Sequence, residues 1–396
     1  MTYKSDTQIY KPRSIVIYVF KPLLFLVIFS FTLEVCARTD DAIKYGAPFW
    51  TAYNNEGLRN DDKAGFPYNI PNARFEKWQN NSLGFRGPEL LQKKPAGNIR
   101  VVCLGSSESY GLYESPGKEW PSQLREILSS RYEVINASVV GLNLRSFEPY
   151  LKKHVFSLKP DVVILVINPL FYVTSLERAA QSNKEPSQSL QKNNKPEPVS
   201  LKGRVLSNSR SIPKMKQVVK QSIGTHYPGA LTRYQLRDTQ KQVEEIERIR
   251  LKGRMPLDEI PEVYLENFRK DLIHTIELIR SQGIEIMLST YPSLIGPETI
   301  TKYPEIFMDN RKFCIEFSVN AILDTMIKFN TVVTQIVADK GTLFVNAASS
   351  IPKTKEFFAD NVHFADKGAR AFADSVAYQL QNTPSNMTLT KQNKSH

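Results

Sequence analysis

Ser107, Asp360 and His363 are the residues of this sequence best suited to activating a hydroxyl group. Ser107 lies in the run Gly-Ser-Ser-Glu-Ser-Tyr-Gly, and Asp360 stands three residues before His363. A serine hydroxyl becomes a nucleophile when a neighbouring base accepts its proton and a carboxylate orients that base. The pattern therefore predicts a Ser107 nucleophile, a His363 base and an Asp360 that fixes the imidazole tautomer. The alternative is structural: Ser107 as a helix N-cap, and Asp360 with His363 as a cap pair before the last helix.

An oxyanion formed at Ser107 would need hydrogen-bond donors close by. Ser107 opens a predicted strand-to-helix turn, where backbone N–H groups point outward and favour an anion. Gly141 follows the next predicted strand, and it has no side chain to keep its N–H from a substrate. We therefore expect the amides of Ser107 and Gly141 to form an oxyanion hole.

Short apolar runs alternate with helical patterns and predict the elements that position these residues. Continuous apolar runs are typical of parallel strands that helices cover on both faces. The alternation predicts a three-layer α/β/α sandwich with a five-stranded parallel sheet over residues 98–382. Ligands bind at the carboxyl ends of such strands, so the loops after them should open on one edge. The predicted strands are Ile99–Leu104, Tyr132–Asn136, Asp161–Ile167, Ile284–Ser289 and Thr342–Val345, and the predicted helices are 120–130, 145–158, 263–281, 320–339 and 366–381.

The same residues resemble the motifs of the SGNH (GDSL-type) hydrolase superfamily. Its first block has the pattern Gly-x-Ser-x-x-x-Gly, and Gly105, Ser107 and Gly111 stand at those positions. Its last block is Asp-x-x-His before the C-terminal helix, and Asp360 and His363 match it. The resemblance implies a flavodoxin-like α/β/α fold, an ester hydrolase activity and the same roles for Ser107, His363 and Asp360.

A second block of the superfamily often reads Val-x-Asn-Ala-x-x-x-Gly, and it implies that Gly141 is an oxyanion donor. The chain matches it with Val134, Asn136, Ala137 and Gly141. The resemblance covers about residues 99–175 and 260–382. All three blocks occur in the expected order, each at the end of a predicted strand.

Two positions depart from the superfamily pattern. The residue before the nucleophile is commonly Asp or Gly, and here it is Ser106. The third block normally supplies an oxyanion Asn near position 170, whereas this chain has Asn168 followed by a proline. We keep Asn168 as the third candidate donor. Removing one such donor typically lowers the rate by roughly 10²–10³, so a weakened catalyst is an open alternative.

Residues 14–33 predict a single membrane-spanning helix. They are apolar apart from Lys21, which Pro22 follows, and roughly 20 apolar residues cross a bilayer core. Basic residues precede the run and acidic residues follow it closely. This charge bias predicts a cytoplasmic segment 1–13 and a periplasmic or extracellular domain.

Three other interpretations of this segment stay open. A cleaved signal peptide would need a small-residue cleavage site, and no clean A-x-A site follows the run. A lipoprotein would be modified at Cys36, where the nearby Glu34 suits the signal poorly. A buried core helix conflicts with apolarity on all sides at the start of the chain. Membrane-anchored relatives with an Asn-Ser-x-Gly-x-Arg-Gly stretch look like bacterial envelope or exopolysaccharide-associated esterases, and residues 81–87 match that stretch.

Three further regions flank or interrupt the domain. Residues 39–97 predict a juxtamembrane segment, in which Arg86 either pairs with a carboxylate of the following domain or belongs to a docked loop. Residues 181–255 form a basic insertion with 16 Lys and Arg against 6 Asp and Glu, most of the chain's net charge of +12. It begins with a low-complexity stretch and ends with a charged helical pattern over 233–251. Residues 383–396 predict a disordered tail.

The candidate partners follow from charge and topology. The basic insertion could contact anionic lipid or gather acidic polysaccharide, or it is a solvated arm without a partner. Nucleic acid is disfavoured because the topology places the domain outside the cytoplasm. Three cysteines without a C-x-x-C pair and scattered histidines predict no metal site and no disulfide framework, and the chemistry implies no cofactor.

These observations favour a membrane-anchored serine esterase. Its expected substrate is an O-acyl (acetyl) ester on an envelope or secreted glycan, or a small ester. An O-acyltransferase on the same fold is one alternative, and a catalytically weakened scaffold for polysaccharide assembly or export is another.

Overall fold

The computed structural model describes residues 13–50, 57–90, 94–171, 173, 209–226 and 228–382. The predicted tail 383–396, the low-complexity start of the basic insertion and residues 1–12 lie outside these ranges. The chain divides into two compact units, residues 1–54 with 198–223 and residues 55–197 with 224–396. The second unit holds the sheet and the candidate site.

Five parallel strands form the central sheet, in the order β6-β5-β7-β8-β9. Every neighbouring pair of strands is parallel. Val101 of β5 lies opposite Val162 of β7, and Val162 lies opposite Glu285 of β8. This confirms the predicted five-stranded parallel sheet, and the order is that of a flavodoxin-like fold. The strands are β5 (Ile99–Leu104), β6 (Tyr132–Asn136), β7 (Val162–Leu165), β8 (Glu285–Ser289) and β9 (Leu343–Val345).

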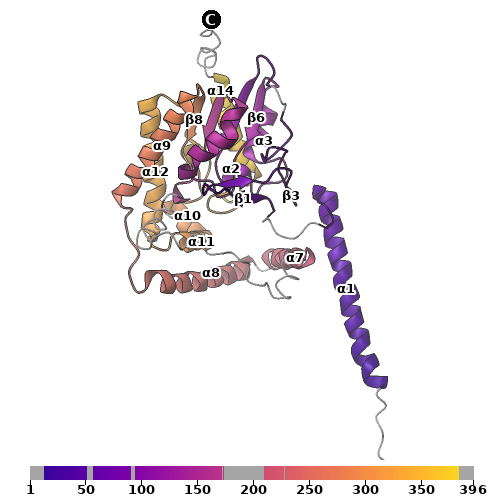
Figure 1. Ribbon diagram of the computed structural model, residues 1–396. Coiled ribbons are helices and arrows are strands. Elements are labelled where there is room, and N and C mark those ends of the chain that lie inside the picture. Colours follow the sequence, from indigo (N-terminus) through magenta and orange to yellow (C-terminus); the bar gives the residue numbers. More distant parts are fainter. Residues whose placement is uncertain are drawn as a thin grey trace, which may run out of the picture. The chain divides into compact units, whose positions relative to one another are not determined.

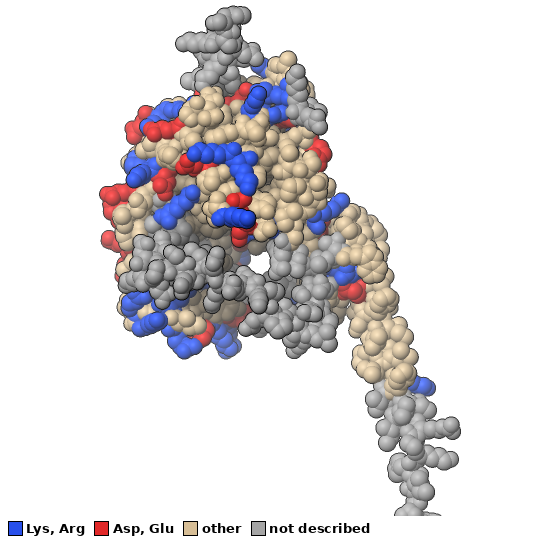
Figure 2. Space-filling view, viewed as in Figure 1, with Lys and Arg blue, Asp and Glu red and all other residues tan. Residues whose placement is uncertain are grey.

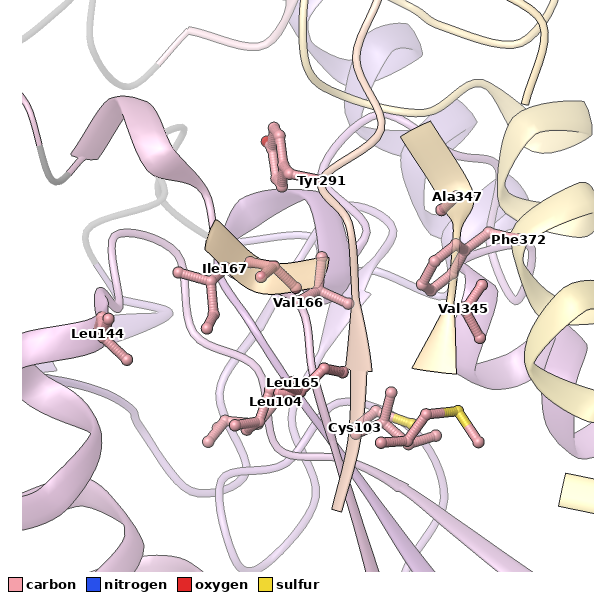
Figure 3. Packing of buried hydrophobic residues seen from close by; sticks show 14 of the residues in the cluster. Cys103, Leu104, Leu144, Leu165, Val166, Ile167, Tyr291, Val345, Ala347 and Phe372 are labelled. Carbon is pink, nitrogen blue, oxygen red and sulfur yellow. The ribbon is translucent and has the colours of Figure 1, made fainter. Parts of the chain in front are cut away.

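Helices cover both faces of this sheet and make the two outer layers (Figure 1). α3 (Trp120–Ile127) and α14 (Asp366–Asn382) pack together on one face, and α9 (Glu262–Ser281) and α12 (Val319–Lys340) on the other. Because helices cover the sheet on both faces, the middle strand β7 is apolar and buried at every position. Figure 3 shows residues of β5 and β7 packed at the ends of these strands.

Smaller elements complete the second unit. Two antiparallel pairs, β1 with β2 and β3 with β4, precede the sheet. Their bounds and those of the remaining helices are β1 (Arg59–Asp61), β2 (Pro67–Asn69), β3 (Arg74–Phe75), β4 (Trp78–Gln79), α2 (Ser107–Tyr110), α8 (Pro228–Leu251), α10 (Pro297–Lys302), α11 (Pro304–Phe313) and α13 (Ala347–Ser350).

The helix predicted over Arg145–Leu158 is wrong as a single α-helix. The segment changes its hydrogen-bond register three times. Pro149 has no N–H to donate, which disfavours a continuous α register here, and Lys159 ends the segment at a φ of +50°. The four pieces are the 3₁₀ helix Leu144–Ser146, α4 (Phe147–Tyr150), the π-helix Leu151–Val155 and the 3₁₀ helix Phe156–Leu158.

α1 (Arg13–Tyr45) contains the predicted span and continues beyond it. Its part from Phe20 onward is 26 residues long, and the most apolar 18 residues of it have a mean hydropathy of 1.8 and are almost entirely exposed. Figure 2 shows the protruding part of this helix as an almost uniformly tan, uncharged surface, with charged residues at its upper end. α12 is also long and apolar enough to cross a membrane, but it packs on the sheet as a core helix. α1 is therefore compatible with a single-pass anchor.

We expect Leu165→Ala to destabilise the second unit. Leu165 is fully buried in the central strand β7, and replacing such a leucine by alanine costs about 2–5 kcal/mol. The free energy of unfolding from urea titration of the detergent-solubilised chain measures the loss. Leu257→Ala, at a half-exposed leucine, is the control and should change stability by less than about 1 kcal/mol. Equal losses for the two variants would contradict the packing described here.

Candidate active site

The turn after β5 presents Ser107 at the carboxyl edge of the sheet. Gly105 makes this turn possible, because a Cβ there would lie 2.4 Å from Ser109 Oγ and 2.9 Å from the Val166 carbonyl oxygen. Ser107 then begins the one-turn helix α2, which ends at Gly111 with a φ of +87°. β5 lies between β6 and β7, where the strand order reverses. Ligands bind at this position in open α/β sheets.

Ser107, His363 and Asp360 form one continuous chain of hydrogen bonds. The Ser107 hydroxyl lies 2.8 Å from His363 Nε2, and His363 Nδ1 lies 2.8 Å from Asp360 Oδ2. Ser107 is 7% exposed and the His363 side chain 14% exposed. The array of Ser107, His363 and Asp360 is therefore largely shielded from water but still accessible to a substrate. The structure thus brings together the three residues predicted for nucleophile, base and orienter.

The loop before α14 fixes the acid and the base relative to each other. Asp360 Oδ1 accepts the N–H groups of Val362 at 2.9 Å and His363 at 2.8 Å, while Oδ2 meets the imidazole. The Leu294 N–H donates to the Asn361 carbonyl, which ties the loop to the segment after β8. One carboxylate therefore holds both the backbone and the ring of His363.

The pKa values of the base and its carboxylate shift in opposite directions. Burial lowers the pKa of His363, but the hydrogen bond and the charge of Asp360 raise it, and the net pKa lies above the ordinary value of 6.5. Burial raises the pKa of Asp360, and the bonds from His363 and the Val362 amide outweigh it, so its net pKa is lowered. Asp360 is therefore ionised at neutral pH and stabilises the imidazolium that proton transfer creates.

Two buried glutamates beside the array were not predicted from the sequence. Glu108 follows the serine, and its Oε2 lies 3.5 Å from Ser107 Oγ while Oε1 accepts the Ser106 N–H at 3.2 Å. Burial raises the pKa of Glu108, and burial raises that of Glu114 to about 7. Both carboxylates also raise the pKa of His363. The sequence offered one signal for Glu108, namely a charged residue in the turn directly after a buried strand. It offered no signal for Glu114.

The two backbone amides predicted as oxyanion donors, those of Ser107 and Gly141, lie at the carboxyl edge of the sheet. The Gly141 amide already has another hydrogen-bond partner. The Ser107 N–H begins α2 and so has no carbonyl partner within the helix. The Gly141 N–H donates to Ser106 Oγ at 3.0 Å. Gly141 has a φ of +84°, and a Cβ there would meet the Arg59 guanidinium at 2.7 Å. Ser106, the departure from the superfamily pattern, therefore occupies the amide that the pattern assigns to the oxyanion.

Asn168 caps the segment that follows β7. Its Oδ1 accepts the Leu170 N–H at 3.0 Å, which leaves its Nδ2 group as the donor. That amide lies beside the buried hydroxyl of Tyr291 and, as a donor to it, opposes the rise of the Tyr291 pKa. Burial raises the pKa of Tyr291 well above its ordinary value, and the charges of Glu108 and Asp360 raise it further. Tyr291, missed by the sequence analysis, follows β8 at the end of the core shown in Figure 3.

Residues 80–86 pack against the elements that carry Ser107. Arg86 is buried and pairs with Glu119 at 3.4 Å, as the first of its two interpretations predicted. It also donates to the Gly111 carbonyl at 2.5 Å and lies 5.0 Å from the centre of the Tyr110 ring. Arg86 thereby holds the C-terminal end of α2 in place.

Comparisons with known proteins find similar folds. No family model and no curated protein matches the chain. The fold is similar to that of an acetyl xylan esterase from Geobacillus stearothermophilus, with 14% identity and a TM-score of 0.39 over 73% of this chain and 97% of that one. It is similar to a lipase/acylhydrolase from Enterococcus faecalis, with 14% identity and a TM-score of 0.38 over 72% and 95%. A likeness this distant leaves the activity open, so the functional argument rests on the site.

We expect Glu114→Gln to move the acidic limb of kcat/KM to lower pH. The ionised form of Glu114 stabilises the imidazolium and raises the pKa of His363. Because the pKa of Glu114 is itself about 7, only part of the population carries this charge on the acidic limb, and the expected shift is small. Without that charge His363 stays neutral, and active as a base, at lower pH. The pH dependence of p-nitrophenyl acetate hydrolysis measures the shift. Glu126→Gln, at an exposed carboxylate, is the control, and a limb that moves upward in Glu114→Gln would contradict the electrostatic account.

The variant Asn168→Ser distinguishes a capping role of Asn168 from a role as oxyanion donor. Serine is a good N-cap, so the variant keeps an acceptor for the Leu170 N–H and loses only the Nδ2 donor. If that donor stabilises the oxyanion, kcat falls by roughly 10²–10³ while stability is kept. Steady-state kinetics and urea titration of the same preparation measure the two quantities. An unchanged kcat would limit Asn168 to capping.

Proposed function

We propose that this chain is a serine esterase of the SGNH type that hydrolyses O-acyl esters. The observation that carries the proposal is the unbroken hydrogen-bonded array from Ser107 Oγ through His363 to Asp360. An activated hydroxyl, a base above its ordinary pKa and an ionised orienting carboxylate are what nucleophilic acyl transfer requires. The sequence motifs of the SGNH superfamily coincide with these residues.

The reaction follows from the positions of these atoms. Ser107 Oγ attacks the ester carbonyl carbon as His363 Nε2 accepts the hydroxyl proton. The resulting oxyanion lies toward the Ser107 N–H, with Gly141 and Asn168 as further candidate donors. His363 then gives the proton to the leaving alcohol oxygen as the C–O bond breaks. A water molecule, activated by His363, hydrolyses the acyl-enzyme and restores Ser107.

The substrate we propose is an acetyl or other short acyl ester on a glycan. A cavity of 370 Å³ opens beside α2. Hydrogen-bonding groups and aromatic rings line it together with Leu58, Leu112 and Val140, so it offers a sugar ring both hydrogen bonds and apolar contact. Val140 in its wall adjoins Gly141, so the cavity reaches the predicted oxyanion loop. The residues that supply these groups are Arg59, Asn60, Asp61, Asn69, Trp78 and Tyr110.

We further propose that α1 anchors the enzyme in a membrane, with the catalytic unit on the periplasmic or extracellular side. The long exposed apolar surface of α1 supports the anchor. The charge bias around residues 14–33 supports the orientation.

Ser107→Ala should abolish ester hydrolysis while leaving the fold intact. Loss of a serine nucleophile of this kind lowers kcat by about 10⁶. Hydrolysis of p-nitrophenyl acetate and labelling by a fluorophosphonate probe should both disappear, with circular dichroism unchanged. Ser349→Ala, in a helix away from the array, is the control. Undiminished turnover by Ser107→Ala would refute the proposal.

The occupied Gly141 amide favours one alternative, a scaffold with weakened catalysis. A folded wild-type chain that neither hydrolyses the ester nor reacts with the probe would support that alternative. A transferase would instead pass the acyl group to added glycan, whereas a hydrolase releases free acid only.

A further inference from the structure

α7 (Ser211–His226) begins at a fixed point on α1. The Glu34 carboxylate accepts the N–H of Arg210 at 2.8 Å and of Ser211 at 3.0 Å, and the hydroxyls of Ser209 and Ser211 at 2.9 Å. The first N–H groups of a helix lack partners within it. A carboxylate of α1 supplies those partners, so α1 determines where α7 starts.

A second set of contacts fixes the first turn of α7. Arg210 pairs with Asp41, and both side chains are almost fully buried. Lys214 pairs with Asp40 and, at 2.9 Å, with Asp41. Two separated attachment points, at Glu34 and at Asp40 with Asp41, restrict rotation of α7 about its own axis. The face that α7 turns away from α1 is therefore set by the structure.

The attachment lies next to the apolar surface of α1. The large apolar side chains from Phe20 to Phe31 are 46% to 69% exposed. Glu34 comes three residues later, which is about 4.5 Å along a helix axis. If residues 14–33 span the bilayer core, the start of α7 lies at the depth of the lipid headgroups.

α7 presents an exposed apolar face with basic flanks. Met215, Val218 and Val219 have helical i, i+3, i+4 spacing and are 51%, 60% and 55% exposed. Lys214 and Lys216 lie on opposite flanks of this face, and the sequence from Ser209 to His226 contains no acidic residue. Apolar side chains between lysines are typical of helices that lie in a membrane interface.

We propose that α7 is an interfacial helix that lies on the bilayer surface beside the exit of α1. Met215, Val218 and Val219 enter the boundary between headgroups and acyl chains, and Lys216 faces anionic headgroups. The proposal rests on the proposed membrane anchor. Continuity with the apolar surface of α1 and the basic charge favour lipid over a protein partner as the occupant of this face.

Fluorescence depth quenching of the full chain in nanodiscs tests the proposal. Single cysteines replace Val219 on the apolar face, Gln217 about 160° away around the helix, and Val27 in the span. Each variant carries Cys36→Ser, because Cys36 is exposed while Cys103 and Cys314 are buried. An NBD label reports polarity, and nitroxide-labelled phosphatidylcholine reports contact with lipid, with and without phosphatidylglycerol.

We expect a blue-shifted label at 219 that shallow nitroxides quench, and a water-like, unquenched label at 217. Phosphatidylglycerol should increase quenching at 219, and Lys216→Gln should remove that increase. Quenching at 27 without quenching at 219 would overturn the interfacial helix and leave the anchor standing. No quenching at 27 would overturn both. A blue shift at 219 without lipid quenching would assign the face to a protein contact and overturn the proposal.

Discussion

The 2.8 Å contact between Ser107 Oγ and His363 Nε2 joins residues 256 positions apart in the chain. No local interaction produces such a contact. It exists because parallel strands end at a common edge, and because the turn after β5 and the loop before α14 both open there. The sheet order, the tight turn at Gly105 and the packing of α14 on α3 all serve to keep this distance short.

The sequence predicted the parts of the fold that depend on apolar periodicity. The five strands agree with the predicted ranges to within two residues. Short continuous apolar runs are typical of strands in a parallel sheet that helices cover on both faces, so their position could be predicted from the sequence. The single helix predicted over 145–158 was wrong because an amphipathic pattern does not distinguish α-helix from 3₁₀ or π-helix, and Pro149 disfavours a continuous α register. α7 went unrecognised because its attachment partners, Glu34 and Asp41, lie about 170 residues away in the chain.

The predicted site residues fall into two groups. Ser107, Asp360 and His363 could be found because their chemistry is legible from residue type and their positions from strand ends. Glu108, Glu114 and Tyr291 could not be placed, since their influence comes from burial, and nothing local in a sequence predicts that a carboxylate or a phenol will lose its water. The hydrogen bond from Gly141 to Ser106 likewise depends on how two loops approach each other.

Asp360 and His363 are bonded to each other within a single four-residue turn. These bonds hold the acid and the base in a fixed geometry relative to each other. Their distance from α2, in contrast, depends on contacts between distant parts of the chain. If that turn shifted by the width of one atom, the imidazole would keep its bond to Asp360 but lose its bond to the Ser107 hydroxyl. The reactivity of Ser107 should therefore depend steeply on the distance between its Oγ and His363 Nε2.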